Sequence, residues 1–586
     1  MDTGIPKVTR EFKEFIISLL RLGKLTEKRI EEFTDGRSME LFRVAFIHKS
    51  YGSEDNYELA EFMGDPVLNS CIAFYLKQRF PEVLSTTFIT RLKHDNISGA
   101  RLAIVAEDAG FLNHILYGSK IQEIIIKTRN LHNSKDYMDM LEDTFEAFIG
   151  TVVNVIDGKT RNGVGNPIAC NIITFLIDKI NISLIFEDVF KAKPRLKEVY
   201  DKPPLRWEIK EELETTHAGR QKKATIYGYP SLIGYGQFKD EEKPLRDHFR
   251  RERRVIAVGY GDTLKIAENE AAENALQFLA DKYNIYPVER KIAKDVKSDM
   301  PKLSETPDFK EFIVRFLKLG RVNDDMIGKF TDKKSMKQFR YAFIHKSYGG
   351  EEISGLSKYL GDVVVDNCIT SYLKKRFQQI VSVKYLTRLK HNITENDLLG
   401  LCVEKTGILK YILYGDKIQE TMDRYENHLH DSDVYTRLLK GAFSALIGVM
   451  VTIIDSKIIE GAGYPVAYNI IFHYLNKISI SLDYESVFDP KTRLKEVYDK
   501  RRWTDSKWSI KKELITRENK DNRTWHTVIY GYPYGGKGRD PNLREIIGEG
   551  EGTNIKKSQD RASENALITL RSVGIHEVRP DPYKKN

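Results

Sequence analysis

The chain has 586 residues, 41% of them hydrophobic, which is long enough for about four domains with buried cores. Its formal net charge of +9 is compatible with a polyanionic partner but does not identify one. No run approaches the roughly 18 consecutive apolar residues of a membrane span, and the first residues lack the apolar core of a secretory signal, so we expect neither a membrane protein nor a secreted one.

The hydrophobic pattern predicts a helical region up to about residue 190. Apolar residues recur at helical spacing over 12–22, 38–47, 58–68, 87–107 and 138–157, whereas the alternation typical of strands is scarce. The pattern changes near residue 193.

From there we predict one helix, three short strands at 207–213, 224–229 and 254–261, and a last helix from 264. The charged stretch 239–254 is expected to form a loop, and 288–307 a linker.

The predicted helix 58–68 carries three acids on one face. Glu58, Glu61 and Asp65 stand at i, i+3 and i+7, and their neighbours are mostly apolar, so the helix is expected to be buried. Buried carboxylates repel one another and resist desolvation, which favours a compensating cation. Oxygen ligands suit Mg²⁺ or Mn²⁺. Asp143 and Glu146 form a second acidic pair at i, i+3 in 138–157. The alternative is two amphipathic helices with solvated acidic faces.

The chain is an internal repeat, which sets its architecture. The offset is 297 residues in the early blocks and 298 in the later one. The matching blocks are 9–16 with 306–313, 45–51 with 342–348, and 195–202 with 493–500.

The four cysteines, Cys71, Cys170, Cys368 and Cys402, show neither a CxxC pair nor a metal-binding spacing with histidine. This pattern predicts reduced, packed thiols in a reducing, cytoplasmic compartment, with the nucleus or a viral factory left open.

The two acidic segments resemble the signatures of the ribonuclease III family. Residues 58–68 read Glu-Leu-Ala-Glu-Phe-Met-Gly-Asp-Pro-Val-Leu, close to E-x-L-E-F-L-G-D-A-V-L, and 143–150 are similar to D-x-x-E-A-L-I-G. The smaller region resembles a double-stranded-RNA-binding domain, whose last helix opens with K-K-x-A-x-x-x-A-A, as at 264–276 and 556–567.

The resemblance implies a multidomain α and α+β chain: two all-α ribonuclease III-like domains, each followed by an α-β-β-β-α double-stranded-RNA-binding domain. The expected boundaries are 1–190, 191–286, a linker over 287–306, 307–489 and 490–580.

On this resemblance, Glu61, Asp65, Asp143 and Glu146 match metal-binding catalytic carboxylates, and Glu58 an accessory catalytic acid. They would hold Mg²⁺, one ion activating water and a second stabilising the leaving 3′ oxygen, so that the products carry 5′-phosphate and 3′-hydroxyl ends. Two departures stand out. The family often has a further acid near Thr86, and Pro66 replaces its Ala or Ser, which is expected to kink the helix.

The resemblance also implies RNA contacts in the small domains. A first-helix lysine would face the minor groove, and lysines opening the last helix would meet phosphates. Ala267, Ala271 and Ala275 are expected to be core residues. Glu268, Glu270 and Glu273 weaken the first small domain as an RNA binder. The lysines expected to bind RNA are Lys197, Lys265, Lys495, Lys556 and Lys557.

The second copy lacks most of the acids. Asp65 is kept as Asp362, but the other four positions hold Gly355, Lys358, Gly441 and Ser444. The repeat therefore predicts one live site. His48 and His345 occur in both copies, so we interpret them as structural.

Family members pair their nuclease domains, so we expect an intramolecular pseudo-dimer, with a homodimer through the first copies as the alternative. The predicted function is metal-dependent cleavage of one strand of double-stranded or hairpin RNA. The alternatives are a non-catalytic or structural RNA-binding protein, and a second copy that binds a protein partner.

Overall fold

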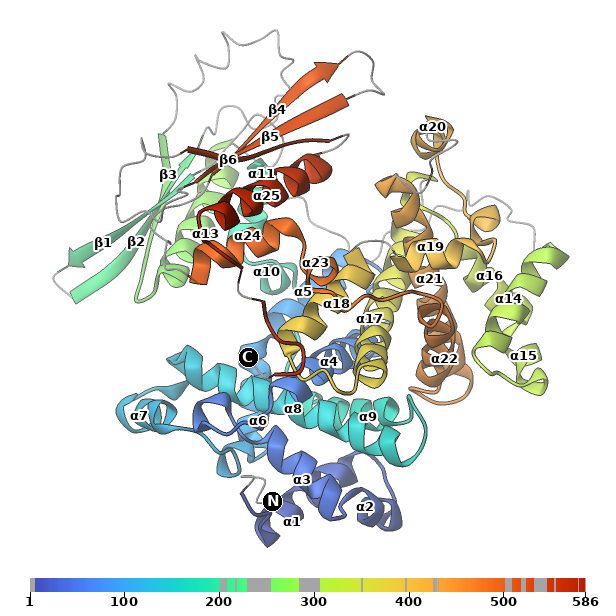
Figure 1. Cartoon of the computed structure of the whole chain (residues 1–586). Coiled ribbons are helices and arrows are strands. Elements are labelled where there is room, and N and C mark those ends of the chain that lie inside the picture. The colour runs from blue at the N-terminus through green and yellow to red at the C-terminus, as the bar shows by residue number, and fades with distance from the viewer. Residues whose placement is uncertain are drawn as a thin grey trace. The chain divides into compact units, whose positions relative to one another are not determined.

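The computed structural model is mostly helical, with strands confined to two small sheets (Figure 1). It forms two compact units, one of residues 1–74, 102–176 and 297–586 and one of 75–101 and 177–296. The structure describes residues 6–200, 208–216, 219–228, 254–283, 306–348, 351–395, 398–424, 429, 432–500, 509–517, 523–531, 545–552, 555–577 and 579–584.

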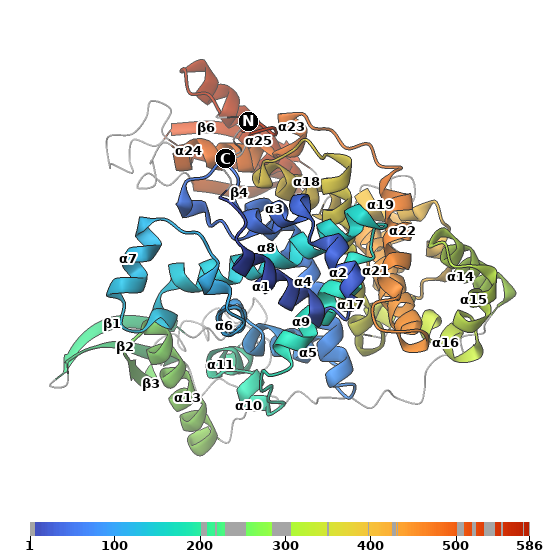
Figure 2. The same cartoon turned by 90° about the horizontal axis from the view of Figure 1, so that it is seen from below.

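Four helices of the first copy, α1, α2, α3 and α5, begin at polar side chains that cap them. Thr9 accepts a hydrogen bond from the backbone N–H of Phe12, and Asp35 accepts one from that of Ser38. Figure 2 shows these helices from below. They are α1 (Arg10–Leu22), α2 (Glu27–Phe33), α3 (Gly36–Ala45), α4 (Glu58–Arg79), α5 (Thr86–Asn96), α6 (Gly99–Asp108), α7 (Ser119–Lys127), α8 (Lys135–Lys159), α9 (Gly165–Ile177) and α10 (Phe186–Val189).

The prediction of one helix over 87–107 was wrong. The chain forms α5 and α6 instead, because Ile97 leaves the helical conformation (φ −124°, ψ 52°) and caps α5 through its N–H to the Lys93 carbonyl. Ser98 and Gly99 follow, two residues that interrupt helices readily. The apolar period continues across this break, so periodicity alone did not reveal it.

The second copy repeats the helical order of the first. Its elements are α14 (Pro307–Leu319), α15 (Asp324–Phe330), α16 (Lys333–Tyr341), α17 (Glu351–Arg376), α18 (Val383–Glu395), α19 (Leu398–Glu404), α20 (Asp416–Arg424), α21 (Asp433–Lys457), α22 (Gly463–Leu475) and α23 (Tyr484–Val487). One continuous core joins α14 to α23. Among the described residues, α21 alone is long and apolar enough to cross a membrane, but 78% of its apolar window is buried in this core.

Each small region is a helix, a three-stranded antiparallel sheet in chain order, and a last helix. Ala267, Ala271 and Ala275 are fully buried against the first sheet, which confirms their prediction as core residues. The stretch 239–253 and most of the linker 288–307 lie outside the described residues. The elements are α11 (Ala192–Tyr200), β1 (Glu208–Thr216), β2 (Gly219–Gly228), β3 (Arg254–Gly261) and α13 (Leu264–Tyr283), then α24 (Pro490–Lys500), β4 (Ser509–Arg517), β5 (Arg523–Gly531), β6 (Glu545–Gly552) and α25 (Ile555–Ser572).

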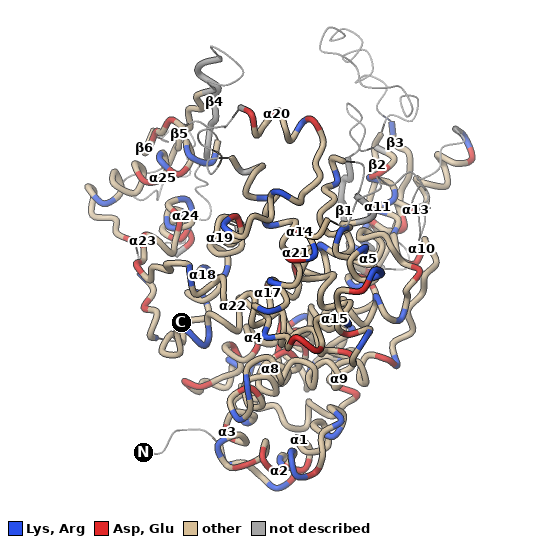
Figure 3. The backbone as a smooth tube through the Cα atoms, turned by 90° about the vertical axis from the view of Figure 1, so that its right-hand side faces the viewer, with Lys and Arg blue, Asp and Glu red and all other residues tan. Residues whose placement is uncertain are grey.

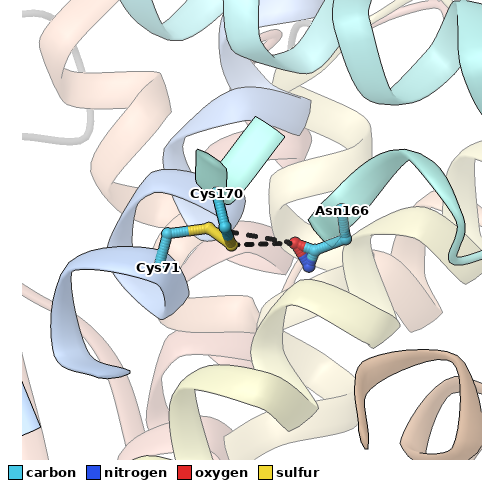
Figure 4. The surroundings of a disulfide bond; sticks show 3 residues. All are labelled: Cys71, Asn166 and Cys170. Atoms are coloured by element: carbon cyan, nitrogen blue, oxygen red, sulfur yellow. Dashed lines mark hydrogen bonds between the residues drawn. A yellow bond between two sulfur atoms is a disulfide. The ribbon is translucent and has the colours of Figure 1, made fainter. Parts of the chain in front are cut away.

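Cys71 of α4 and Cys170 of α9 form a disulfide, with Cα atoms 5.2 Å apart, beside Asn166 (Figure 4). The prediction that all four thiols are reduced was therefore wrong for this pair. The two residues are 99 positions apart, so only the packing of α4 on α9 brings them together. Cys368 and Cys402 are free.

The two copies meet reciprocally at the start of α9 and of α22, both within the first compact unit. A Cβ at Gly163 would lie 3.2 Å from Cα of Pro465, and one at Gly461 would lie 3.1 Å from Cα of Pro167. The two contacts pair equivalent positions of the repeat.

Candidate active site

Two glycines let α4 and α8 cross closely enough for their acids to meet. A Cβ added at Gly64 would stand 1.8 Å from the Glu146 carbonyl oxygen, and one at Gly150 would stand 2.1 Å from that of Ala60. No side chain fits at either point, so the backbones lie in direct contact. The crossing brings the acidic faces of the two helices together.

Seven carboxylates gather at this crossing, more than the five predicted. On α8 they stand at i, i+3, i+4 and i+7, which is one continuous helical stripe. We call these residues the acid cluster: Glu58, Glu61 and Asp65 of α4, with Asp139, Glu142, Asp143 and Glu146 of α8.

Four acids of the cluster, Glu61, Glu142, Asp143 and Glu146, resist ionisation because they are buried close to other carboxylates. Burial, with the charge of Asp143 as the next cause, raises the pKa of Glu61 to about 8. Burial likewise raises the pKa of Glu146 to about 9, with Asp65 the next cause. The pKa of Asp143 is also raised by burial. Such a group of like charges is unfavourable unless protons or a cation neutralise it.

Neighbouring side chains hold two of these carboxylates in place. The Tyr57 hydroxyl, fully buried, donates to Oδ2 of Asp143 at 2.7 Å, and Nδ2 of Asn69 donates to Oδ1 of Asp65 at 2.7 Å. Lys49 lowers the pKa values of Glu61 and Asp143 by its positive charge, although burial outweighs it.

Sequence reasoning missed Tyr57, Asn69, Asp139 and Glu142. Asp139 and Glu142 could have been predicted from the sequence, because they extend the spacing of Asp143 and Glu146 by one helical turn. Burial, with Asp143 and Asp139 next, raises the pKa of Glu142 to about 7, so it belongs to the same electrostatic group. Tyr57 and Asn69 carry no such spacing signal.

The donor set suits a hard cation, since every group is a carboxylate oxygen. Among the described residues, however, no three or more His, Cys, Asp or Glu side chains are arranged so that they could hold a metal ion. Bringing them to a common centre requires the carboxylates to turn toward one another.

The two departures from the family pattern, Pro66 and Thr86, both lie in helices. Helix α4 runs without interruption from residue 58 to 79, with Pro66 inside it. Thr86 opens α5, where Ser85 caps the helix by accepting from the N–H of Phe88.

His48 is part of a turn rather than of the acid cluster. The N–H of Ser50 donates to its Nδ1 at 3.1 Å, and burial lowers its pKa to about 4. The second copy builds the same turn, in which the N–H of Ser347 donates to Nδ1 of His345 at 3.2 Å. A feature kept where the acids are absent supports the structural interpretation.

The equivalent crossing of the second copy keeps its glycines but not its acids. A Cβ at Gly361 would stand 1.6 Å from the Ser444 carbonyl oxygen, so α17 and α21 cross as α4 and α8 do. Nζ of Lys358 lies 2.5 Å from Oδ2 of Asp362, the one acid retained. Figure 3 lets the charges of these four helices be followed along the backbone.

All five lysines predicted to contact RNA are exposed, three of them near the N-termini of α13 and α25. The acids predicted to weaken the first small domain are engaged internally. Glu268 pairs with Lys193 at 2.7 Å and Glu273 with Arg195 at 2.5 Å. Glu270 accepts from the backbone N–H of Tyr260. These acids therefore stabilise the domain.

Comparison with known proteins matches both helical copies to one family. The ribonuclease III domain model matches residues 58–154 and 357–452. The chain is 28% identical over 292 residues to a putative ribonuclease 3 of Invertebrate iridescent virus 6, covering 47% of this chain and 89% of that protein.

Two further relatives show the same likeness. A putative ribonuclease 3 of Frog virus 3 (isolate Goorha) is 32% identical over 188 residues, 31% of this chain and 48% of that protein. Ribonuclease 3 of Enterococcus faecalis (strain ATCC 700802 / V583) is 28% identical over 250 residues, 41% of this chain and 90% of that protein.

The helical fold, the acid cluster and these matches define two nuclease domains. The chain carries two ribonuclease III domains and is a ribonuclease III-type endonuclease acting on RNA.

Proposed function

We propose that this enzyme is a metal-dependent endoribonuclease that cuts one strand of double-stranded or hairpin RNA at each binding event. The observation that carries the proposal is the contrast between the two crossings. The first nuclease domain gathers seven carboxylates, whereas the second retains one acid at those positions, Asp362, joined to Lys358. The same backbone frame therefore supports one hydrolytic site.

Glu61, Asp65, Asp143 and Glu146 would hold Mg²⁺ or Mn²⁺, with Glu58 beside them. Their oxygen donors, and the raised pKa values of Glu61 and Glu146, fit a site completed by a cation. When bound, the ions supply activation of water and stabilisation of the leaving 3′ oxygen.

The surrounding side chains orient these acids. Tyr57 fixes one oxygen of Asp143 and Asn69 fixes one of Asp65, which leaves the other oxygen of each free to turn inward. Lys49 reduces the repulsion within the acid cluster. The fold thus limits which way the carboxylates move when the charge of a cation is added.

The reciprocal contacts of Gly163 with Pro465 and of Gly461 with Pro167 support an intramolecular pseudo-dimer of the two nuclease domains. In such a pair each strand of a duplex meets one domain, so a single live site cuts a single strand. A homodimer through the first domains would restore two live sites and give staggered double cuts.

The small domains support binding to duplex RNA. Each has a helix, three antiparallel strands and a helix, as expected for a double-stranded-RNA-binding domain. The exposed Lys265, Lys556 and Lys557 lie near helix N-termini, where they suit phosphates, and Lys197 and Lys495 are exposed on α11 and α24.

The test is cleavage of a long RNA hairpin whose two strand ends carry different labels, in Mg²⁺ or EDTA. The wild type is expected to cut in Mg²⁺ only, and Asp65→Ala is expected to lose cutting. Asp108→Ala, which removes an exposed acid of α6 in the same domain, is the matched control and is expected to cut normally. Cleavage that persists in EDTA or in Asp65→Ala would refute the proposal.

A further inference from the structure

The crossing of α17 and α21 has not merely lost charge but reversed it. Where the first domain has the seven acids of the acid cluster, the second has three cations and one acid, so the formal charge at these positions changes from −7 to +2. We call this set the vacated site: Gly355, Lys358 and Asp362 of α17, with Arg437, Lys440, Gly441 and Ser444 of α21.

Lys358 of α17 packs against Gly441 of α21. A Cβ at Gly441 would lie 3.4 Å from Cε of Lys358, so the lysine side chain lies over the glycine that replaces Asp143. Its ammonium group ends at Asp362, the counterpart of Asp65, at 2.5 Å. In the vacated site the ammonium group of Lys358 is therefore the positive charge beside Asp362. In the first domain the corresponding positive charge would be a metal ion held by the acids.

Two further lysines extend this positive charge toward the first domain. Nζ of Lys390 lies 2.7 Å from Oδ2 of Asp366 and 5.9 Å from the ring centre of Phe62, a residue of α4. Lys440 donates to the carbonyl of Thr394. Lys390, paired with Asp366, therefore lies against the helix that carries the live site.

The positively charged end of the Lys358 side chain is exposed to solvent. The side chain of Lys358 is 51% exposed although it is paired with Asp362, and an ammonium group has three donors, so one carboxylate does not exhaust it. Phosphodiester oxygens are the acceptors that lysine binds as a point charge. A duplex cut on one strand by the first domain presents its other strand to the second.

We propose that the vacated site is a phosphate-binding site for the uncut RNA strand, in which Lys358 and Lys440 each contact a backbone phosphodiester without a metal ion. This inference rests on the proposed function, since it requires duplex RNA to span both nuclease domains. It gives the second domain a role in holding substrate while the first one cuts.

The test measures the binding of an end-labelled RNA duplex to the full chain in EDTA. Fluorescence anisotropy gives the affinity at each of a series of salt concentrations. Lys358→Gln/Lys440→Gln is expected to weaken binding about tenfold and to lower the slope of log affinity against log salt by about 2, roughly one per lost phosphate contact. The matched control, Lys333→Gln/Lys334→Gln, removes two exposed lysines of α16 and is expected to keep the wild-type slope.

A second variant separates phosphate binding from a purely structural ion pair. Lys358→Gln/Asp362→Asn removes both charges of the pair, and the proposal predicts a slope lower by about 1. In Mg²⁺, KM for hairpin cleavage is expected to rise more than kcat falls. A salt slope equal to that of the wild type in both variants would overturn the inference, whatever happens to thermal stability. Failure of the wild type to bind or cut duplex RNA would instead overturn the proposed function.

Discussion

Glu146→Gln is expected to stabilise the metal-free enzyme at about pH 7.5. The Glu146 carboxyl is buried and faces Asp65, which raises its pKa to about 9 from an ordinary value near 4.5. Between these values the unfolded chain ionises this group whereas the folded chain keeps it protonated. Stability is therefore lost as the pH rises above about 4.5, and the loss is complete near pH 9.

The magnitude follows from the size of that interval. About three pH units separate 4.5 from 7.5, which corresponds to an upper value of about 4 kcal/mol at about 1.4 kcal/mol per unit. The repulsion is shared with Glu61 and the other acids, so removal of one carboxylate recovers part of it, about 1–2 kcal/mol. In a nuclease domain of this size, that raises the unfolding temperature by about 2–8 °C.

The assay is thermal unfolding of the full chain in EDTA, with hydrogen exchange of α8 to locate the change. The gain is expected to shrink as the pH falls toward 5, where little of the carboxyl is ionised even in the unfolded chain. Glu40→Gln, an exposed glutamate of α3, is the matched control and is expected to change neither quantity. If Glu146→Gln is no more stable than wild type at about pH 7.5, the electrostatic reasoning is wrong.

Four other perturbations test separate parts of the account. Two glutamates of the acid cluster, Glu61 and Glu146, have pKa values of about 8 and about 9, so Mg²⁺ must displace protons when it binds. The stabilisation of the folded chain by Mg²⁺ is therefore expected to increase from about pH 6 to 9. Calorimetry that finds no proton release on Mg²⁺ binding would contradict this. Gly150→Ala is expected to separate the crossing helices, which lowers the free energy of unfolding by about 2 kcal/mol and abolishes cleavage. Gly158→Ala is the control, since nothing lies close to Gly158, and it is expected to change neither quantity. Tyr57→Phe is expected to lower kcat about tenfold with little change in KM, since it frees one carboxylate oxygen, and an unchanged kcat would remove Tyr57 from the site. Reduction of the Cys71–Cys170 disulfide, which closes a 99-residue separation, is expected to destabilise the first domain by up to about 4–5 kcal/mol, and Cys71→Ser should be insensitive to reductant.

The helices and the acids of α4 and α8 could be predicted because they follow periodic patterns. Spacing placed Glu61 and Asp65 on one face, and Asp143 and Glu146 on another, and the structure brings the two faces together at the glycine crossing. The reversed charge at Lys440 was also visible in the sequence, once Glu142 is counted as part of the stripe.

Features that depend on tertiary contact were not predictable in this way. Tyr57 and Asn69 reach the acids through packing, and nothing in their spacing marks them. The disulfide joins residues that share no motif. The break at Ile97 lies inside an unbroken apolar period, where local capping decides the outcome.

The central claim is that one chain carries one live site, and the most direct measurement counts cuts per strand by enzyme of known mass. Single-turnover cleavage of a doubly labelled RNA hairpin, with light scattering on the same sample, gives both numbers. The account predicts that a monomer cuts one strand of each duplex. Equal cutting of both strands by a monomer would contradict it.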